Sequence, residues 1–313
     1  MLEHLIILLD DTSISYCYAE TPSAESRLIS TDTLKKAIVF GMKENLMINF
    51  VLPADHQLSK EYLDILETID HNKIGQGIRV ANDIADIGNG GIVILRITYN
   101  TFISNIDQIG NSLSSVDRLN ICFVDIENFK DSDIPAYTEA LSILVKRIHE
   151  QQKKGLNPSL NLITDRIGKT TMANCGAGVS NITVAPNGKF YLCPAFYYDE
   201  QLNIDNLLNH SHPESKRSVG DLDMGLNIPN KELLHIDYAP LCRICDAYHC
   251  HRCIWLNQKM TGDINTPSHQ QCVMAHIERN AARQLEILTA EDGKITTIPE
   301  INYIDPFDLF VRK

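Results

Sequence analysis

Residues 242–253 read Cys-Arg-Ile-Cys-Asp-Ala-Tyr-His-Cys-His-Arg-Cys, which is two Cys-x2-Cys pairs separated by four residues. The chain has 313 residues and nine cysteines, and seven of these cysteines form one series in its C-terminal half. A Cys-x2-Cys pair lets two thiolates bind one metal centre from a single turn, and thiolates in cells bind iron–sulfur clusters or zinc. The series therefore predicts a soft-metal centre. Its members are Cys175, Cys193, Cys242, Cys245, Cys250, Cys253 and Cys272.

Two local structures should hold the outer cysteines of this series. Residues 181–193 predict a β-hairpin around an Asn-Gly turn, because Asn-Gly supplies the positive φ that tight hairpins need, and Cys193 ends its second strand. An amphipathic helix is predicted over 272–288, with His276 among its inward-facing residues. We expect Cys272 to open this helix, where the helix N-terminus stabilises a thiolate.

The first 165 residues alternate strand and helix patterns, which is typical of parallel βαβ units. A dinucleotide-binding glycine motif is missing, and the pattern alone leaves open a full barrel, a partial barrel or an open doubly wound sheet. Apolar runs predict strands at 5–9, 47–52, 92–98, 120–126 and 159–163. Amphipathic patterns predict helices at 33–43, 59–69, 102–113 and 133–152.

Composition narrows the class of protein. A hydrophobic content of 44% is enough for a folded core, and a net charge of −12 argues against binding to nucleic acid or to an anionic membrane surface. The N-terminus lacks the basic start of a signal peptide, and no stretch approaches the roughly 20 apolar residues of a membrane span. We therefore expect a cytoplasmic protein, in which paired thiols indicate metal binding more often than disulfides.

The order of the cysteines resembles the signature of the SPASM domain. The series reads C-x12-G-x4-C, then C-x2-C-x4-C-x2-C, then x18-C, and it differs from the SPASM pattern by one residue in each of two inner gaps. The resemblance implies an α/β fold in which a partial TIM-like barrel is followed by a cysteine-rich domain with a hairpin and a C-terminal helix. It implies a barrel-like part at 1–165, a SPASM part at 166–288 and a tail at 289–313.

The same resemblance implies two auxiliary 4Fe–4S clusters. By motif position, the first cluster would be held by three thiolates, with its fourth iron open or bound by another group, and the second by four. The ligands would be Cys175, Cys193 and Cys253 for the first cluster, and Cys242, Cys245, Cys250 and Cys272 for the second.

SPASM domains follow radical S-adenosylmethionine enzymes, whose first strand leads into a Cys-x3-Cys-x2-Cys motif. Here Tyr-Cys-Tyr at 16–18 aligns with the end of that motif, so the two earlier cysteine positions fall on Asp10 and Ile14. The Gly-Gly-Glu that usually ends the second strand is replaced by Pro-Ala-Asp at 53–55. We therefore expect a degenerate radical-enzyme site that binds no S-adenosylmethionine.

The chain also resembles CXXX repeat peptide maturases, through 253–257, 265–268, 271–272 and 276–279. This resemblance implies a role in ribosomal peptide modification, with a cysteine-rich precursor peptide and a separate modifying enzyme as candidate partners. Whether the chain is itself an enzyme stays open. The alternatives are a cluster enzyme that acts on the peptide without S-adenosylmethionine, and a peptide-binding scaffold stabilised by zinc.

Simpler interpretations accompany these assignments. Zinc could replace the clusters, with His249 and His251 as nitrogen ligands, although these histidines more plausibly flank the thiol loop. Cys17 and Cys122 are expected to be ordinary buried thiols. The acidic residues that follow the first two strands could bind a cation or a substrate amine, but are expected to be solvated loop acids: Asp10, Asp11 and Asp55.

Overall fold

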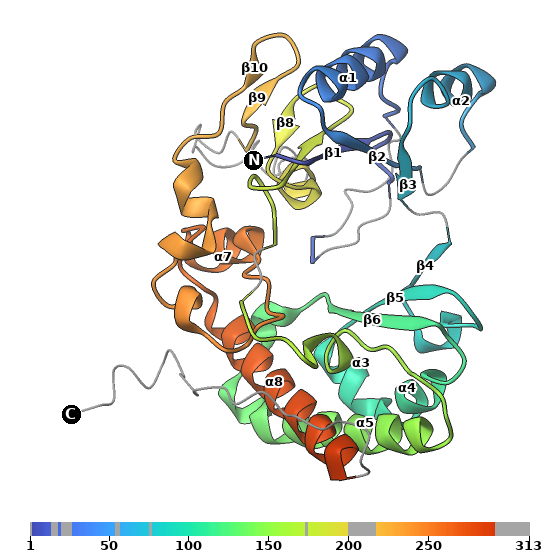
Figure 1. The fold of residues 1–313 in the computed structure, drawn as a ribbon, viewed down its shortest axis with the longest axis vertical. Helices are drawn as coiled ribbons and strands as arrows, with labels where there is room; N and C mark the ends of the chain where they lie inside the picture. Colours follow the sequence, from blue (N-terminus) through green and yellow to red (C-terminus); the bar gives the residue numbers. More distant parts are fainter. Residues whose placement is uncertain are drawn as a thin grey trace, which may run out of the picture. The chain divides into compact units, whose positions relative to one another are not determined.

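The computed structural model describes residues 2–13, 18–19, 27–53, 57–74, 77–172, 175–199 and 217–291. It divides into two compact units, and Figure 1 labels their helices and strands. The first unit comprises 1–76 with 176–234, and the second comprises 77–175 with 235–313. Each unit thus joins an N-terminal stretch to a stretch from the cysteine-rich half, and the division at residues 165 and 288 stays a prediction about the sequence.

The first unit is built on a five-stranded sheet with the order β3-β2-β1-β7-β8. Every neighbouring pair is parallel except β7 and β8, which form the antiparallel hairpin that the Asn-Gly turn predicted. The central strand β1 pairs on both sides, with His4 opposite Met47 and also opposite Asn181. The strands are β1 (His4–Leu8), β2 (Met47–Val51), β3 (Asn72–Ile74), β7 (Asn181–Val184) and β8 (Phe190–Tyr191).

Helices connect the first three strands of this sheet. Helix α1 (Thr31–Lys43) starts where the Ser30 hydroxyl accepts a 3.1 Å hydrogen bond from the backbone N–H of Thr33, which satisfies one of the free donors of its first turn. Its apolar face, with Leu34 and Ala37 fully buried, supplies the core of the unit. The remaining elements are α2 (Lys60–Leu66), a helical turn at 194–199, the ribbon β9 (Gly220–Asp221) and β10 (Gly225–Leu226), and the 3-10 turn Lys231–Leu234.

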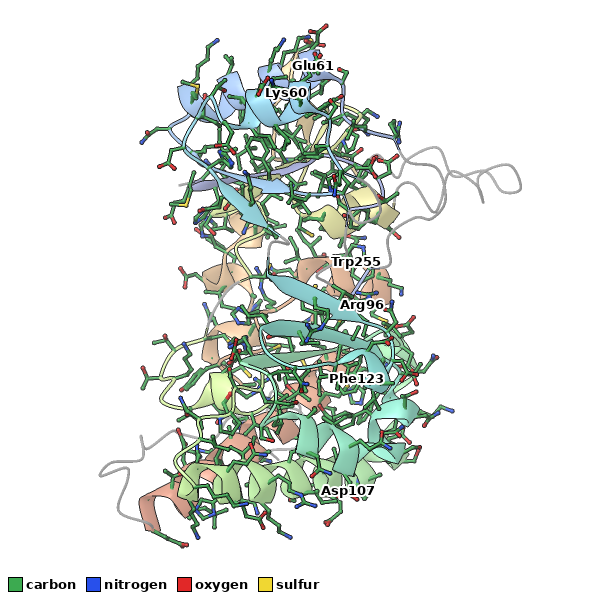
Figure 2. The ribbon with its side chains drawn as sticks, turned by 90° about the vertical axis from the view of Figure 1, so that its right-hand side faces the viewer. Lys60, Glu61, Arg96, Asp107, Phe123 and Trp255 are labelled. Atoms are coloured by element: carbon green, nitrogen blue, oxygen red, sulfur yellow. The ribbon has the colours of Figure 1, made fainter. Side chains whose placement is uncertain are left out.

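The second unit contains a three-stranded parallel sheet with the order β4-β5-β6. One face packs on helices through an aromatic cluster in which Phe123 contacts Phe102 and Tyr137, and Figure 2 shows Phe123 on the helix side of the sheet. The elements are β4 (Ile78–Ala81), β5 (Ile92–Ile97), α3 (Tyr99–Ser104), α4 (Ile106–Ser112), β6 (Arg118–Phe123), α5 (Ile134–Lys153), α7 (Ile254–Thr261) and α8 (His269–Glu291).

Helix α8 lies along α5 and carries several buried charged residues into this unit. Arg166 forms an ion pair with Glu278 on α8, and the Tyr137 hydroxyl donates a 2.7 Å hydrogen bond to the same carboxylate. Short 3-10 turns complete the unit, at Ile84–Asp86, Ile126–Asn128, Asp131–Asp133, Thr164–Arg166, Ile236–Tyr238 and Cys242–Ile244. None of the helices in the described part of the chain has both the length and the apolar character needed to cross a bilayer.

The α/β class and the parallel strands are confirmed, while three local predictions were wrong. Residues 159–163 form no strand, because the Thr164 hydroxyl binds the N–H of Leu160 and the chain turns after a single bridge to Leu119. The helix predicted at 102–113 is two helices that meet at Asn105, whose φ of −124° breaks the first. The last helix begins before residue 272, so the cysteine there lies in its first turn.

Closure of the two sheets into a partial barrel stays a prediction. Residues 200–216, and nearly all of the tail predicted at 289–313, lie outside the described residues.

Candidate metal centre

The thiol loop, residues 242–253, is shaped by short turns that bring its cysteines together. The first pair sits on a 3-10 turn, in which the N–H of Cys245 donates to the carbonyl of Cys242 at 3.1 Å. A second turn joins the N–H of Cys250 to the carbonyl of Ala247 at 2.8 Å. Two consecutive turns in so few residues fold the loop back on itself, so the thiols gather instead of spreading along an extended chain.

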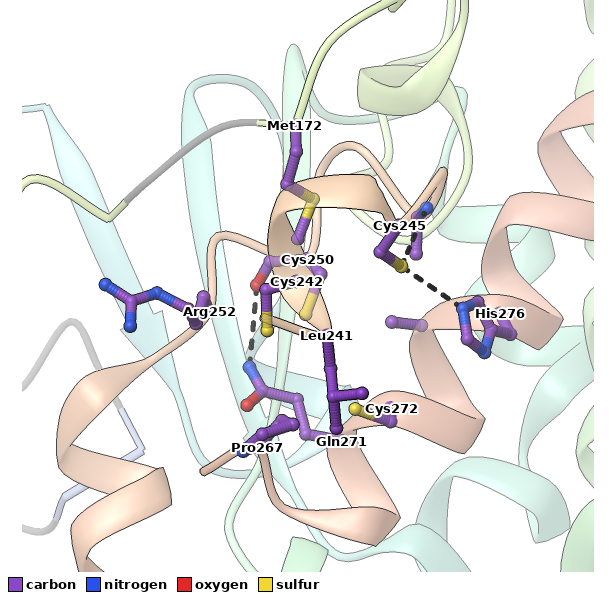
Figure 3. Close-up of a pocket in the computed structure, with 12 residues that line it drawn as sticks. Met172, Leu241, Cys242, Cys245, Cys250, Arg252, Pro267, Gln271, Cys272 and His276 are labelled. Carbon is purple, nitrogen blue, oxygen red and sulfur yellow. Dashed lines mark hydrogen bonds between the residues drawn. The ribbon is translucent and has the colours of Figure 1, made fainter. Parts of the chain in front are cut away.

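Four thiols line one pocket in the second unit, as Figure 3 shows. Cys242 and Cys245 are almost fully buried, with 6% and 9% of their surface exposed. The fourth thiol comes from the first turn of α8, where the N–H of Cys272 bonds the carbonyl of Ser268 at 3.0 Å. The four are Cys242, Cys245, Cys250 and Cys272, the set assigned to the second cluster by motif position, and the structure brings them together.

The walls around these thiols are mostly apolar. Met172, Leu241, Ala247 and Ala275 line the same pocket. Burial raises the pKa of the Cys242 thiol to about 11. Burial also raises the pKa of Cys250 to about 12, against a hydrogen bond from a backbone N–H that lowers it. A metal entering this pocket would therefore displace protons from neutral thiols.

Arg252 closes the loop between Cys250 and Cys253. Both His251 and Arg252 have left-handed backbone conformations, with φ of 58° and 45°, which is unfavourable for residues with a Cβ. Arg252 is held there by burial, with 1% of its surface exposed, and by a 2.6 Å hydrogen bond from its Nη1 to Asn265. Its backbone N–H also donates to the Cys250 sulfur. The left-handed conformations of these two residues let the chain reverse direction between Cys250 and Cys253, where the gap is one residue shorter than in the SPASM pattern.

His276 is a polar residue of the pocket whose contact the sequence did not predict. Its Nε2 lies 3.3 Å from the Sγ of Cys245, and one donor atom each of Cys245, Asp246 and His276 lies within 4.8 Å of the others. Asp246 is 2% exposed and forms an ion pair with Arg279. The spacing of residues 272 and 276 could have indicated that His276 lies near the thiols, because residues four apart on a helix share one face.

The two histidines of the thiol loop make other contacts. His251 Nε2 lies 2.8 Å from His249 Nδ1, and His249 Nε2 lies 3.2 Å from the carboxylate of Asp165. Neither histidine lines the thiol pocket. Burial opposes ionisation of Asp165, but hydrogen bonds from His249 and Arg118 hold the pKa of its carboxyl well below the usual range. His249 and His251 thus lie in the thiol loop but do not line the pocket, and as zinc ligands they remain a prediction.

The ligand set assigned to the first cluster is spread over both units. Cys175 and Cys253 belong to the second unit, where Cys253 precedes α7 as its N-cap residue. Cys193 belongs to the first unit, just after β8. Their assignment to one cluster stays a prediction. Cys122 lies half-buried on β6 and receives a 4.0 Å contact from Arg96.

The acids after β1 are buried, so the expectation of solvated loop acids was wrong for both that the structure describes. Asp10 has no exposed surface and accepts a 2.6 Å hydrogen bond from the N–H of Thr12. Asp11 forms a 3.0 Å ion pair with Arg27 and accepts the hydroxyl of Tyr197. Among the positions compared with the radical-enzyme motifs, four more lie outside the described residues: Ile14, Cys17, Ala54 and Asp55, together with the neighbouring Tyr16.

Solved structures of anSMEcpe are similar to this chain in fold. The match to native anSMEcpe with bound AdoMet and Cp18Cys peptide covers 93% of this chain and 99% of the anSMEcpe chain. Its TM-score is 0.55 and the sequence identity is 12%. The match to native anSMEcpe with bound AdoMet covers 93% of this chain and 100% of the anSMEcpe chain, with a TM-score of 0.54 and 12% sequence identity. No family model matches the sequence, and no curated protein matches it. At this identity the likeness concerns the fold alone, and it extends over nearly the whole of both chains.

Proposed function

We propose that this chain is a SPASM-type iron–sulfur protein of a ribosomal peptide modification system, of the kind that matures CXXX repeat peptides. It binds two 4Fe–4S clusters and a cysteine-rich precursor peptide in the cytoplasm, and it leaves cleavage of S-adenosylmethionine to a separate enzyme. The observation that carries the proposal is the convergence of four thiols on one pocket.

The donor set of this pocket fits an iron–sulfur cluster. Four thiols match the four corner ligands of a 4Fe–4S cluster, and apolar walls keep water away from its sulfides. Cys242, Cys245, Cys250 and Cys272 would hold the cluster, with Cys250 oriented by the backbone N–H of Arg252. The bound group would supply one-electron transfer, and an open iron at the first cluster would supply a place for a substrate thiolate.

A peptide partner is supported by the fold. The similar structures include anSMEcpe with a bound peptide, and the fold aligns over nearly the whole of both chains. Cysteine richness of the peptide rests on the sequence resemblance to CXXX repeat peptide maturases. The acidic net charge of −12 fits a protein or peptide partner better than a nucleic acid or a membrane.

The absence of S-adenosylmethionine cleavage rests on the sequence. Isoleucine has no atom that ligates iron, so Ile14 cannot replace the second thiolate of a Cys-x3-Cys-x2-Cys motif. Asp10, at the first position, has a buried side chain that accepts the N–H of Thr12. Both observations support a barrel that binds peptide without starting radical chemistry.

Metal analysis of anaerobically purified protein tests the proposal. We expect about eight irons and eight sulfides per chain, with broad absorbance near 400 nm. The Cys250→Ser variant should lose about half of this iron, whereas Cys122→Ser, its matched control outside the pocket, should keep all of it. A synthetic peptide with CXXX repeats should bind the loaded protein, and a chain that converts the peptide without a second enzyme would contradict the partner role.

Zinc is the second candidate, and one distance favours it. Ligands of a single tetrahedral zinc lie roughly 3.5 Å apart, from metal distances of about 2.3 Å to sulfur and about 2.0 Å to nitrogen. The separation of 3.3 Å between Cys245 and His276 is close to this value. The chain would then be a zinc-stabilised scaffold for the peptide. Stoichiometric zinc without sulfide in the purified protein would establish this alternative and exclude cluster chemistry.

A further inference from the structure

The Cys245 sulfur has hydrogen-bond partners in two directions. The backbone N–H of Ala247 donates to it at 3.4 Å, and Nε2 of His276 lies 3.3 Å away on the side of α8, as the dashed line in Figure 3 marks. Both distances are within the range of hydrogen bonds to sulfur. Cys245 therefore differs from a thiol that only packs among apolar neighbours.

The position of the imidazole is fixed by its surroundings. His276 is 8% exposed and follows Cys272 by one turn of α8, so the helix that supplies a thiol to the pocket also supplies this ring. Beside it, the Asp246 carboxylate is 2% exposed and anchored by the ion pair with Arg279, which comes from the next turn of the same helix. Burial and a shared rigid helix leave the ring little freedom to turn away from Cys245.

We propose that His276 is a positioning residue for the metal centre, which donates Nε2–H to the Cys245 thiolate without binding iron. The inference rests on the proposed function, because it assumes a cluster held by the four pocket thiols. Those thiols already fill the four corners of a cubane cluster, so the imidazole is left as a donor to a ligand. A hydrogen bond to a ligating sulfur withdraws negative charge from it and favours the reduced cluster.

The first test uses the loaded wild-type protein with 15N-labelled histidine and needs no variant. Pulsed EPR of the reduced protein should show weak coupling to one histidine nitrogen, as expected for a hydrogen bond through sulfur. Strong coupling, typical of nitrogen bound to iron, would overturn the donor role, and so would no coupling. Protein without iron would instead refute the proposed function, so the two failures are distinguishable.

A redox titration followed by EPR is the second test. His276→Phe keeps a planar ring but removes the donor, so the midpoint potential of one cluster should fall while that of the other stays unchanged. His276→Gln places an amide N–H near the position of Nε2 and should restore part of the shift. The control is His269→Phe, an exposed histidine at the start of the same helix that bonds Asp131 at 2.9 Å. Equal potentials in wild type and His276→Phe would overturn the inference.

Discussion

A buried ion pair attaches α8 to the segment before the first cysteine of the series. Arg166 and Glu278 have side chains that are only 7% and 9% exposed, and Tyr137 donates to the same carboxylate. Arg166→Met removes the positive partner and leaves a buried carboxylate with one neutral donor. Breaking a buried pair in this way costs about 3–5 kcal/mol, because the remaining charge has lost its compensation.

A surface ion pair between α5 and α4 provides the matched control. Arg147 lies 3.6 Å from Asp107, and the two side chains are 42% and 74% exposed. Arg147→Met makes the same substitution as Arg166→Met, but at a position exposed to water. Exposed pairs contribute about 0–1 kcal/mol, and the two variants should differ by several kcal/mol in the free energy of unfolding. Guanidinium unfolding of metal-free protein, followed by circular dichroism, measures both under one set of conditions.

The double variant Arg166→Met/Glu278→Leu separates the charge effect from the loss of packing. If an unpaired carboxylate causes the damage, removing it should return most of the lost stability, so the double variant should be more stable than Arg166→Met alone. An Arg166→Met variant no less stable than Arg147→Met would refute the reasoning, since the carboxylate would then be solvated or neutral. The same result would loosen the argument that α8 is a rigid support for the metal centre.

Three further predictions follow from the remaining sites. Cys253→Ser and Cys272→Ser should each lose about half of the iron, and the double variant nearly all of it, because the two residues are assigned to different clusters. Equal iron content in the double and single variants would place both residues at one cluster. Burial, with the hydrogen bond to a carboxylate, raises the pKa of Tyr197 far above 10, so its stabilisation is complete below about pH 10 and is lost as pH rises through the folded pKa. Urea midpoints at pH 8 and pH 10.5 should differ more in wild type than in Tyr197→Phe, and parallel profiles would contradict this. Gly178→Ala should destabilise the chain by more than the roughly 1 kcal/mol expected for Gly155→Ala. A Cβ at 178 would lie 2.5 Å from a leucine carbon, whereas a Cβ at 155 meets open space. Similar thermal midpoints of the two variants would show that the leucine moves aside.

Elements with strong local patterns were predictable from the sequence. Strand β1 came from a continuous apolar run, and α5 from a long amphipathic pattern. The short strands β3 and β4 were missed, because three or four residues with polar members carry no clear periodicity and depend on a neighbouring strand for pairing. The false strand at 159–163 shows the reverse case, where a threonine hydroxyl competes with sheet pairing for a backbone N–H.

The candidate site divides in the same way. The resemblance to the SPASM pattern assigned the thiols to two sets, and the four thiols of the second set line one pocket. The buried state of Asp11 was not predictable, because it depends on Tyr197, a residue 186 positions away whose hydroxyl reaches the carboxylate. The contact between His276 and Cys245, 31 positions apart, likewise exists only once α8 packs against the thiol loop.

The shortened gap between Cys250 and Cys253 links the sequence pattern to the chemistry. A gap with one residue fewer must turn more sharply, and the chain does so through positive φ at His251 and Arg252. A glycine at 252 would adopt this conformation without strain, but it would lose the buried guanidinium. Burial lowers the pKa of that guanidinium, and the charges of the Cys242, Cys175 and Cys250 sulfurs, where these are ionised, oppose the shift. The strained arginine therefore places a buried cation beside the sulfurs of the proposed metal centre, which a glycine could not supply.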